Sequence, residues 1–511
     1  MNLVRSLRIS QLQVNLAANF AGRMWGALIG LIFVPVYVRY LGIESYGLVG
    51  FFAALQATAQ VLDFGLAATL NRELARLSAL PDRRGDARDF VRTLEVGYWG
   101  VGAVLALVTW ALAPLLAGQW IQAEGVPLST VENAVRAMAV VLGLQWPLGI
   151  YYGGLMGLQR QARANALRIG MTTLAAVGAA AVLARISSDI ETFFLWQGIA
   201  AAGHLALAVV LLWRTLPASD HRPRFSWSML KGSWKFAAGM TGITITAVIA
   251  TQLDKVLLSG LLSLEMFGYY SLAAVLAGGL RVISAPMFDA LFPRFSALIA
   301  LGDEPSLRSL YHRSAQLMSM LTVPLTAVLS LFAYEIVNVW TGSELTAERT
   351  APVLALLALG TGVNGLWVMP YALQLASGWT SLAFGLNAAL IAALVPALVF
   401  LTPRYGSVGA ASAWAIFNAV GLLVASVLTH RRVLRGDWLP WGWHDVCLPL
   451  LGTLVVVLIV RVAMPPSLGT VGQVAWMAGA VLAAMGAALL LSHRLRSWAV
   501  VQFGQPGATR G

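Results

Sequence analysis

The sequence predicts an all-α, polytopic membrane protein with about fourteen transmembrane helices. Only 11% of its 511 residues are charged, whereas a soluble domain carries about 25%. Apolar runs of about 20 residues, the length that crosses a ~30 Å hydrocarbon layer, recur along the chain. The cations gather in alternate breaks between these runs. Together these observations exclude a soluble protein of several domains.

The apolar runs define the expected spans in order. The first run follows Arg5 and Arg8 and ends at Tyr40 without small residues suited to signal cleavage, so we expect it to be retained as a span. The spans are expected at residues 14–39, 46–70, 94–118, 130–154, 165–184, 191–213, 236–260, 266–290, 314–340, 350–373, 379–401, 407–429, 445–463 and 472–492.

The placement of the 34 Lys and Arg residues predicts the orientation of the chain. Breaks that alternate along the chain, together with both ends, hold 25 of them, and the opposite breaks hold five. Cytoplasmic loops carry the excess of Lys and Arg, so both termini are expected in the cytoplasm. The net charge of +12 is therefore an orientation signal and does not indicate nucleic-acid binding.

Two pairs of segments indicate an internal repeat. LGIESYGLVGFFAAL (41–55) matches LSLEMFGYYSLAAVL (262–276), and residues 195–216 match residues 413–434 at nearly the same offset. Six spans separate the copies, and an even number gives both halves the same orientation in the membrane. Such a parallel repeat is typical of transporters with a site between the halves. We expect a six-helix lobe at 1–214, a cytoplasmic linker at 215–235, a second six-helix lobe at 236–435, and two accessory helices with a tail at 436–511.

Four segments carry a further signal: residues 35–76, their echo at 251–282, and the segments 153–170 and 406–424, which read GGLMGLQRQARANALRIG and GSVGAASAWAIFNAVGLLV. In these segments the chain resembles the polysaccharide-transporter branch of the multidrug/oligosaccharidyl-lipid/polysaccharide exporter superfamily. The resemblance implies two six-span lobes around a central cavity. It also implies transfer of an undecaprenyl-pyrophosphate-linked oligosaccharide from the cytoplasmic to the periplasmic leaflet by alternating access. The partners would be this lipid, the surrounding membrane lipids and other membrane proteins of polysaccharide assembly.

Four cations lie inside expected spans, where charged residues usually face a cavity or a partner. Arg23 and Arg281 lie on opposite lobes, each about 14 Å from the cytoplasmic end of its span. We predict that they hold the pyrophosphate as a two-arginine clamp. Arg136 and Lys255 lie nearer the outer face and are predicted to relay the headgroup. A structural role, paired with an acid or snorkelling to the interface, is the alternative for each.

The acids inside expected spans are candidates for ion coupling or for salt bridges to the cations. They are Asp63, Asp254, Asp289 and Glu335. Asp254 and Lys255 are neighbours separated by about 100° of helix rotation, so they are not expected to pair with each other.

Other functions are less compatible with the sequence. Span 1 holds Arg23 and no acid, which favours an anionic cargo over the cation or drug efflux of the multidrug branch. A lipid II flippase would also have fourteen spans and arginines in its cavity. The residue types therefore distinguish it poorly from an oligosaccharide flippase. A membrane glycan polymerase or ligase would need a large periplasmic loop. The outer loops are short, and the sequence contains no HExxH motif, nucleophile elbow or phosphate-binding loop. We therefore do not expect the protein to be an enzyme. With Cys447 as the only cysteine, no Cys-based metal site is expected, and no cofactor is predicted.

Overall fold

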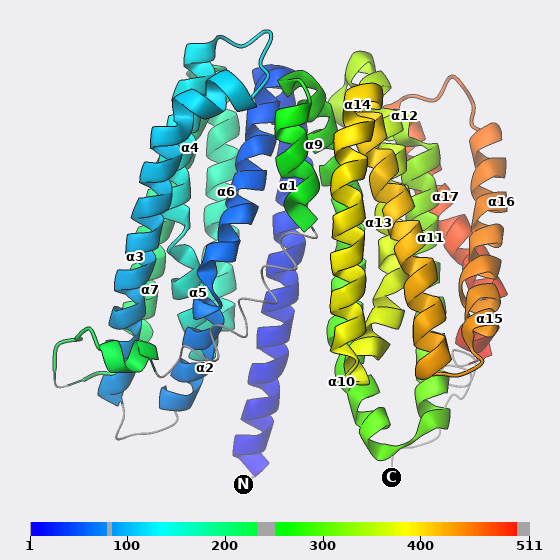
Figure 1. The fold of residues 1–511 in the computed structure, drawn as a ribbon, viewed down its shortest axis with the longest axis horizontal. Coiled ribbons are helices and arrows are strands. Elements are labelled where there is room, and N and C mark those ends of the chain that lie inside the picture. The colour runs from blue at the N-terminus through cyan, green and yellow to red at the C-terminus, as the bar shows by residue number, and fades with distance from the viewer. Residues whose placement is uncertain (1, 79–83, 220, 232–250, 498–511) are drawn as a thin grey trace. The chain divides into compact units, whose positions relative to one another are not determined.

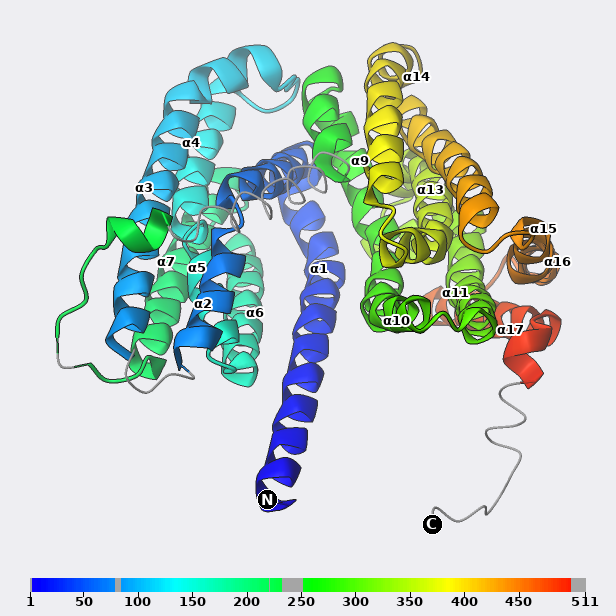
Figure 2. The ribbon, with the colours of Figure 1, turned by 60° about the horizontal axis from the view of Figure 1, so that its bottom comes forward.

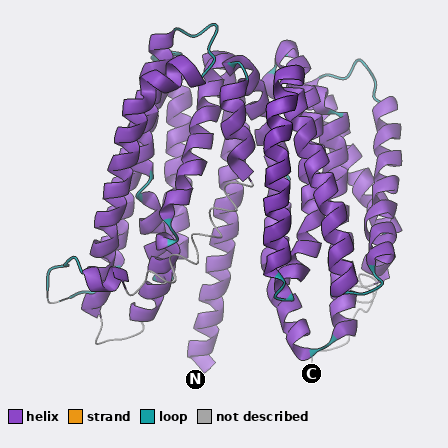
Figure 3. Cartoon of the chain, in the orientation of Figure 1, coloured by secondary structure: helices purple, strands orange, loops and turns teal. Residues whose placement is uncertain are grey.

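The computed structural model describes residues 2–78, 84–219, 221–231 and 251–497, without the side chains of residues 2–14, 16, 17, 23 and 84. The described residues are almost entirely helical and form no strand (Figure 3). They divide into two compact units, residues 1–268 and 269–511, and the division falls within α9 (Leu264–Gly278).

The first unit is a bundle of apolar helices. Its elements are α1 (Asn2–Ala59), the 3-10 turn η1 (Gln60–Asp63), α2 (Leu66–Ser78), α3 (Arg84–Leu115), the π-helical turn η3 (Leu116–Trp120), α4 (Leu128–Gln145), α5 (Leu148–Gly157), α6 (Gln161–Arg185) and α7 (Ile190–Thr215). Residues 251–261 form a further helix before α9.

The second unit is also helical throughout its described part. It contains α10 (Arg281–Leu301), α11 (Glu304–Leu331), α12 (Ala333–Thr341), α13 (Glu344–Ala376), α14 (Thr380–Arg432), α15 (Trp438–Pro440), the π-helical turn η4 (Trp441–Cys447), α16 (Leu448–Val462) and α17 (Thr470–Leu491).

Two of the longest helices bend back on themselves, as Figures 1 and 2 show for α1 and α14. Each contains one glycine with non-helical backbone angles: Gly42 (φ 77°, ψ 163°) in α1 and Gly406 (φ 59°, ψ −145°) in α14. These positive φ angles are easily reached only by glycine, which has no Cβ. Each bend falls between two expected spans, so α1 and α14 each account for more than one crossing.

Eleven helices in the described residues are long and apolar enough to cross a membrane. Two of them contain the bends just described, at Gly42 and Gly406. The expected span at 236–260 lies largely outside the described residues, since positions 236–250 are not described. With this span and the doubled helices, the structure is consistent with fourteen crossings.

Two expected spans are each interrupted by a short turn. The span at 130–154 is divided into α4 and α5 at Trp146–Pro147, and the span at 266–290 is divided into α9 and α10 at Gly279–Leu280. Proline removes one backbone donor and clashes with the preceding turn, which explains the first break. Glycine lowers helix stability at the second.

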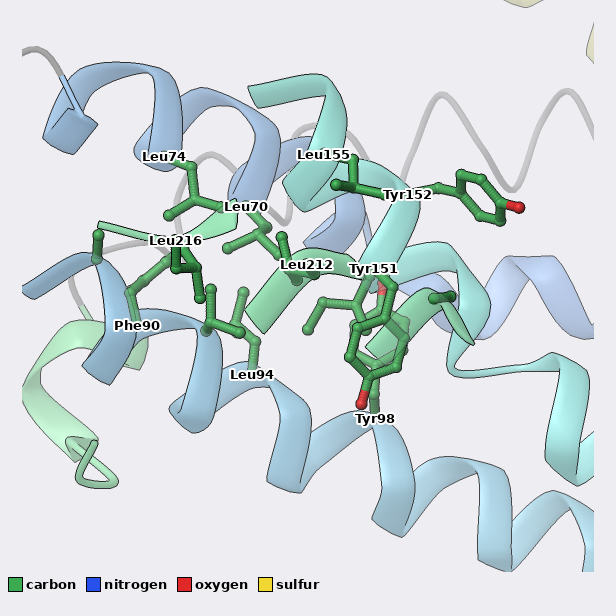
Figure 4. Packing of buried hydrophobic residues seen from close by; sticks show 14 of the residues in the cluster. Leu70, Leu74, Phe90, Leu94, Tyr98, Tyr151, Tyr152, Leu155, Leu212 and Leu216 are labelled. Carbon is green, nitrogen blue, oxygen red and sulfur yellow. The ribbon is translucent and has the colours of Figure 1, made fainter. Parts of the chain in front are cut away.

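Apolar side chains hold α2, α3, α5 and α7 together at one end of the first unit (Figure 4). The fully buried members of this core include Leu70, Leu74, Val91, Ile150, Tyr151, Leu155 and Leu212. Glycines bring the backbones of α2 and α5 close. A Cβ on Gly153 would approach the carbonyl oxygen of Ala67 to 2.6 Å, and one on Gly157 would approach that of Asn71 to 2.5 Å. Small residues at helix contacts are the usual way to gain van der Waals packing in a membrane.

The two copies of the first repeat segment contact each other reciprocally inside the first unit. A Cβ on Gly47 would overlap with the carbonyl oxygen of Leu264, and a Cβ on Gly268 would overlap with that of Ile43. Gly47 matches Gly268 in the repeat, and Ile43 matches Leu264. The contact therefore obeys the pseudo-symmetry that the repeat predicts.

Accessory helices α16 and α17 pack on α11 in the second unit. Their shared apolar core includes Val328, Phe332, Val457, Ala480 and Ala484. A polar cluster extends this packing, because α11 presents His312 between two carboxylates. The ring Nε2 lies 3.3 Å from Asp437, and Nδ1 bonds to Asp445, whose side chain is completely buried.

Neighbouring side chains complete this cluster. Arg308 pairs with Asp437, and the Gln316 amide donates to Asp445 at 2.9 Å. The backbone amide of Leu495, beyond α17, donates to the Gln316 side-chain oxygen at 3.0 Å. One buried network thus connects α11 to η4 and to the chain after α17.

Replacing Gly268 by alanine should destabilise the protein. The added Cβ overlaps with the Ile43 carbonyl, and overpacking of this kind typically costs about 1–3 kcal/mol. The measurement is the thermal unfolding midpoint of the purified protein in detergent. Gly30→Ala is the control, because a Cβ there meets no atom within 4 Å. Equal midpoints for the two variants would contradict the close contact.

Replacing Asp445 by alanine should destabilise the second unit more strongly. The change leaves the buried His312 Nδ1 and the Gln316 amide without their carboxylate partner, and each unpaired buried polar group costs about 1–3 kcal/mol. The matched control is Glu304→Ala, which removes an exposed partner of Arg308 and should change the unfolding midpoint little. If both variants unfold at the wild-type temperature, the network does not anchor the accessory helices.

Candidate functional site

Two helix breaks lie at the same cavity in the first unit. After α1 the chain tightens into η1, and Phe64 (φ 48°) and Gly65 (φ 67°) then leave the helical conformation. The second break is that between α4 and α5, before Pro147. In membrane transporters, interrupted helices are tolerated where they line a cavity, and they often mark the binding site.

The cavity has a volume of about 270 Å³, and its walls combine polar side chains with apolar surface. Its walls are Gln56, Gln60, Asp63, Leu142, Gln145, Trp146 and Gly149. Three of these residues carry neutral amides and one carries a carboxylate, while none is a cation. Polar side chains in an apolar bundle are costly unless they bind partners or a ligand.

The acid at the cavity is held by its neighbours. Oδ1 of Asp63 accepts a hydrogen bond from the Tyr98 hydroxyl and another from the Ala67 backbone amide at 3.4 Å. The Tyr98 ring stacks on Trp146, with ring centroids 6.0 Å apart and planes inclined by 25°. Asp63, Tyr98 and Trp146 are therefore connected to one another along one wall of the cavity.

The amides at the cavity are also joined. The Gln56 side-chain nitrogen donates to the Gln145 side-chain oxygen at 2.5 Å. This bond links the second half of α1 to the end of α4. It consumes one donor and one acceptor and leaves the Gln56 oxygen and the Gln145 nitrogen for other partners.

The predicted arginine clamp is not tested by the structure. Arg23 lies on α1, and its side chain is outside the described residues. Arg281 is the first residue of α10 in the second unit, and its guanidinium lies over the Trp414 ring at 5.9 Å from the centroid. Cation–π contact of this kind orients a guanidinium without neutralising its charge. The pairing of the two arginines stays a prediction.

The predicted outer relay residues both have local partners. Arg136 pairs with Glu132 one turn earlier at 2.5 Å and lies 5.8 Å from the centre of the Trp110 ring. Lys255 donates to the Thr251 carbonyl at 3.1 Å.

Lys255 also corrects one expectation. Its Nζ lies 3.8 Å from the Asp254 carboxylate, so the adjacent residues do pair. A lysine side chain with four methylene groups is long and flexible enough to bend around the helix.

The other candidate acids differ in their surroundings. Glu335 on α12 pairs with Arg461 on α16 at 2.5 Å, and Arg461 lies over the Phe332 ring. Asp289 lies on an exposed part of α10. Ion coupling by Asp63, Asp254, Asp289 or Glu335 stays a prediction. Among the described residues, no group of three or more His, Cys, Asp or Glu side chains is placed to hold a metal ion.

The amides of the cavity are not among the residues predicted from the sequence, because that prediction rests on charged residues inside the spans. A spacing signal was present: Gln56, Gln60 and Asp63 stand at i, i+4 and i+7, which is one face of a helix. A polar stripe within an apolar span indicates a helix face that lines a cavity or meets a polar partner. Gln145 and Tyr98 come from other helices, and only the fold brings them to this stripe.

One family model matches more than half of the chain, and several known proteins are similar to it. The sequence model of the family described as polysaccharide biosynthesis protein matches residues 13–299. A Shigella flexneri protein assigned as an O-antigen transporter is 21% identical over 429 residues, covering 81% of this chain and 96% of that protein. The lipopolysaccharide biosynthesis protein WzxC of Escherichia coli K12 is 23% identical over 449 residues, covering 82% of this chain and 84% of WzxC.

A solved structure shares the fold. The lipid II flippase MurJ in an inward closed conformation matches with a TM-score of 0.68 and 13% identity, covering 96% of this chain and 99% of that chain. At this identity the likeness concerns the fold alone, and it extends over nearly the whole length of both chains.

Replacing Tyr98 by phenylalanine should loosen the cavity wall. The hydroxyl is the side-chain donor to Asp63, whose Oδ1 keeps the Ala67 amide, so the variant loses one hydrogen bond worth about 0.5–1.5 kcal/mol. We expect a lower thermal unfolding midpoint in detergent. Tyr405→Phe is the control, because Tyr405 is 64% exposed. Indistinguishable midpoints would show that the hydroxyl does not hold Asp63.

Proposed function

The chain belongs to the family of polysaccharide biosynthesis proteins, and from this premise we propose that it is a flippase for a lipid-linked oligosaccharide. The observation that carries the proposal is the family match over residues 13–299, more than half of the chain. The relatives assigned to O-antigen transport and lipopolysaccharide biosynthesis support a glycan cargo. The apolar helices of the described residues provide the membrane-spanning scaffold.

The cargo would be an undecaprenyl-pyrophosphate-linked oligosaccharide that moves from the cytoplasmic to the periplasmic leaflet. The polyprenyl tail can stay in the hydrocarbon layer, so the protein must shelter only the charged and sugar-bearing headgroup. Alternating access would open the site first to one leaflet and then to the other. No covalent bond changes in this process, and the protein would act as a transporter rather than as an enzyme.

We place the protein in the bacterial inner membrane with both termini in the cytoplasm. The uneven division of Lys and Arg, 25 against five, supports this orientation. Membrane lipids surround the bundle, and membrane proteins that build or extend the glycan are its expected functional partners.

Arg23 and Arg281 would bind the pyrophosphate. Guanidinium groups bind phosphate oxygens in bidentate fashion, and a charged hydrogen bond contributes about 1.5–3 kcal/mol. Arg281 already has its guanidinium positioned over Trp414. Arg136 and Lys255 would receive the headgroup later, each exchanging its local acid partner for phosphate.

Removing either clamp arginine should impair translocation. We expect Arg23→Gln and Arg281→Gln each to lower the flipping rate about tenfold or more, the factor that corresponds to the loss of one charged hydrogen bond. The measurement uses proteoliposomes loaded with undecaprenyl-pyrophosphate-linked oligosaccharide, and headgroup exposure is read by a sugar-oxidising or lectin probe.

The exposed Arg404 provides the matched control, as Arg404→Gln. If both clamp variants fold and flip at the wild-type rate, the proposed arginine clamp is wrong. The family assignment would not be affected. A second arm with lipid II separates the proposed cargo from peptidoglycan precursor. Transport of lipid II alone would overturn the oligosaccharide proposal.

A further inference from the structure

We propose that the cavity between η1 and the α4–α5 break binds one neutral monosaccharide unit of the transported glycan. This inference rests on the proposed function, and it names the part of the cargo that the first unit recognises. The residues assigned to recognition are Gln56, Gln60, Asp63, Gln145 and Trp146.

The hydrogen-bonding chemistry of the lining matches sugar hydroxyls. Each glutamine amide offers both donors and acceptors, and each hydroxyl also donates and accepts. After the Gln56–Gln145 bond is made, an amide oxygen of Gln56 and an amide nitrogen of Gln145 remain, and Gln60 adds a complete amide. The Asp63 carboxylate adds an acceptor for a hydroxyl proton. Such a mixed set suits several adjacent hydroxyls.

The same lining is unsuited to the pyrophosphate. The cavity holds a carboxylate and no cation, so a phosphate group there would meet a like charge without compensation. A sodium ion is the competing ligand, because the Gln56, Gln60 and Asp63 side chains also offer oxygen atoms to a hard cation. The Gln145 amide nitrogen that remains after the Gln56 bond and the Trp146 ring suit a sugar and would not bind a cation.

The dimensions of the cavity indicate a single ring. Its volume of about 270 Å³ is slightly below the ~300–1,000 Å³ of most small-molecule pockets. A whole repeat unit would not fit. Trp146 provides an aromatic wall, and its ring is fixed by stacking on Tyr98, whose hydroxyl is tied to Asp63.

A pocket with several fixed hydrogen-bonding groups would discriminate between sugars. A sugar that lacks one of the bonded hydroxyls would leave a protein polar group unpaired, and sites built around hydrogen bonds reject such analogues strongly. The cavity would therefore contribute to the choice of glycan, whereas the arginines hold the pyrophosphate common to all lipid-linked oligosaccharides.

The first experiment measures sugar binding without transport. The full chain is placed in nanodiscs, and saturation-transfer NMR is recorded with D-glucose, D-galactose, D-mannose, L-rhamnose and N-acetyl-D-glucosamine in turn. We expect at least one sugar to receive magnetisation. Gln60→Leu and Gln145→Leu should weaken its affinity about three- to tenfold, the effect of losing one neutral hydrogen bond.

The matched control is Gln197→Leu. Gln197 is a half-buried glutamine of α7 outside the cavity, and the variant should bind as wild type does. All variants are first compared by gel filtration and thermal unfolding. The proposal is overturned if no sugar binds, or if the cavity variants of native stability bind as the wild type does.

A sodium titration tests the competing ligand. Line broadening of ²³Na is measured for wild type and Asp63→Asn. Sodium binding that is lost in Asp63→Asn, without any sugar signal, would replace the sugar assignment by a cation site. Sugar binding that is unaffected by sodium supports the proposal.

Headgroup translocation separates this inference from the proposed function. Sugar binding that depends on the cavity, combined with no flipping of the lipid-linked oligosaccharide by wild type, would sink the flippase proposal and retain the pocket as a sugar site. If the wild type flips the lipid-linked oligosaccharide but the cavity variants bind sugar with unchanged affinity, the sugar site is wrong and the flippase proposal stands. The two failures are thus distinguishable.

Discussion

The need to satisfy every backbone hydrogen bond without water is the constraint on which this structure depends. Within a hydrocarbon layer an unpaired amide or carbonyl costs several kcal/mol, so helices are the available solution for this chain. The chain meets this constraint with long helices, and the helical conformation is interrupted at only a few places in the described residues. Gly42 and Gly406 turn the chain between crossings, whereas the breaks at Gly65 and Pro147 meet at the polar cavity.

Buried acids in the described helices show how this environment treats charge. Glu95 accepts from Tyr151 at 2.6 Å and from Trp213 at 3.2 Å, and it pairs with Arg92. Asp445 is enclosed by His312 and Gln316. Both carboxylates are bound by fixed neighbours and serve packing. Asp63 differs from both because it also lines a cavity. A ligand can therefore reach its carboxylate.

The proposed flippase and the proposed sugar pocket divide the recognition of one cargo by chemistry. A pyrophosphate needs cations, and the candidates for this role are guanidinium groups. A sugar needs mixed donors and acceptors, and the cavity of the first unit supplies amides, a carboxylate and an aromatic wall. On these two proposals, the residues that bind the pyrophosphate and the residues that select the glycan are separate sets.

The sequence by itself determined the membrane class, the approximate positions of the crossings, the expected orientation and the family resemblance. These properties depend on local composition and on the distribution of charge along the chain, which a linear pattern records. Even the polar stripe of Gln56, Gln60 and Asp63 was visible as a helical spacing. Only the tertiary structure decided that Gln145 and Trp146 lie across from it, and that Lys255 turns to Asp254. It also placed Glu335 beside Arg461. Contacts between distant segments depend on helix packing and side-chain reach, and neither is encoded in hydropathy or in charge counts.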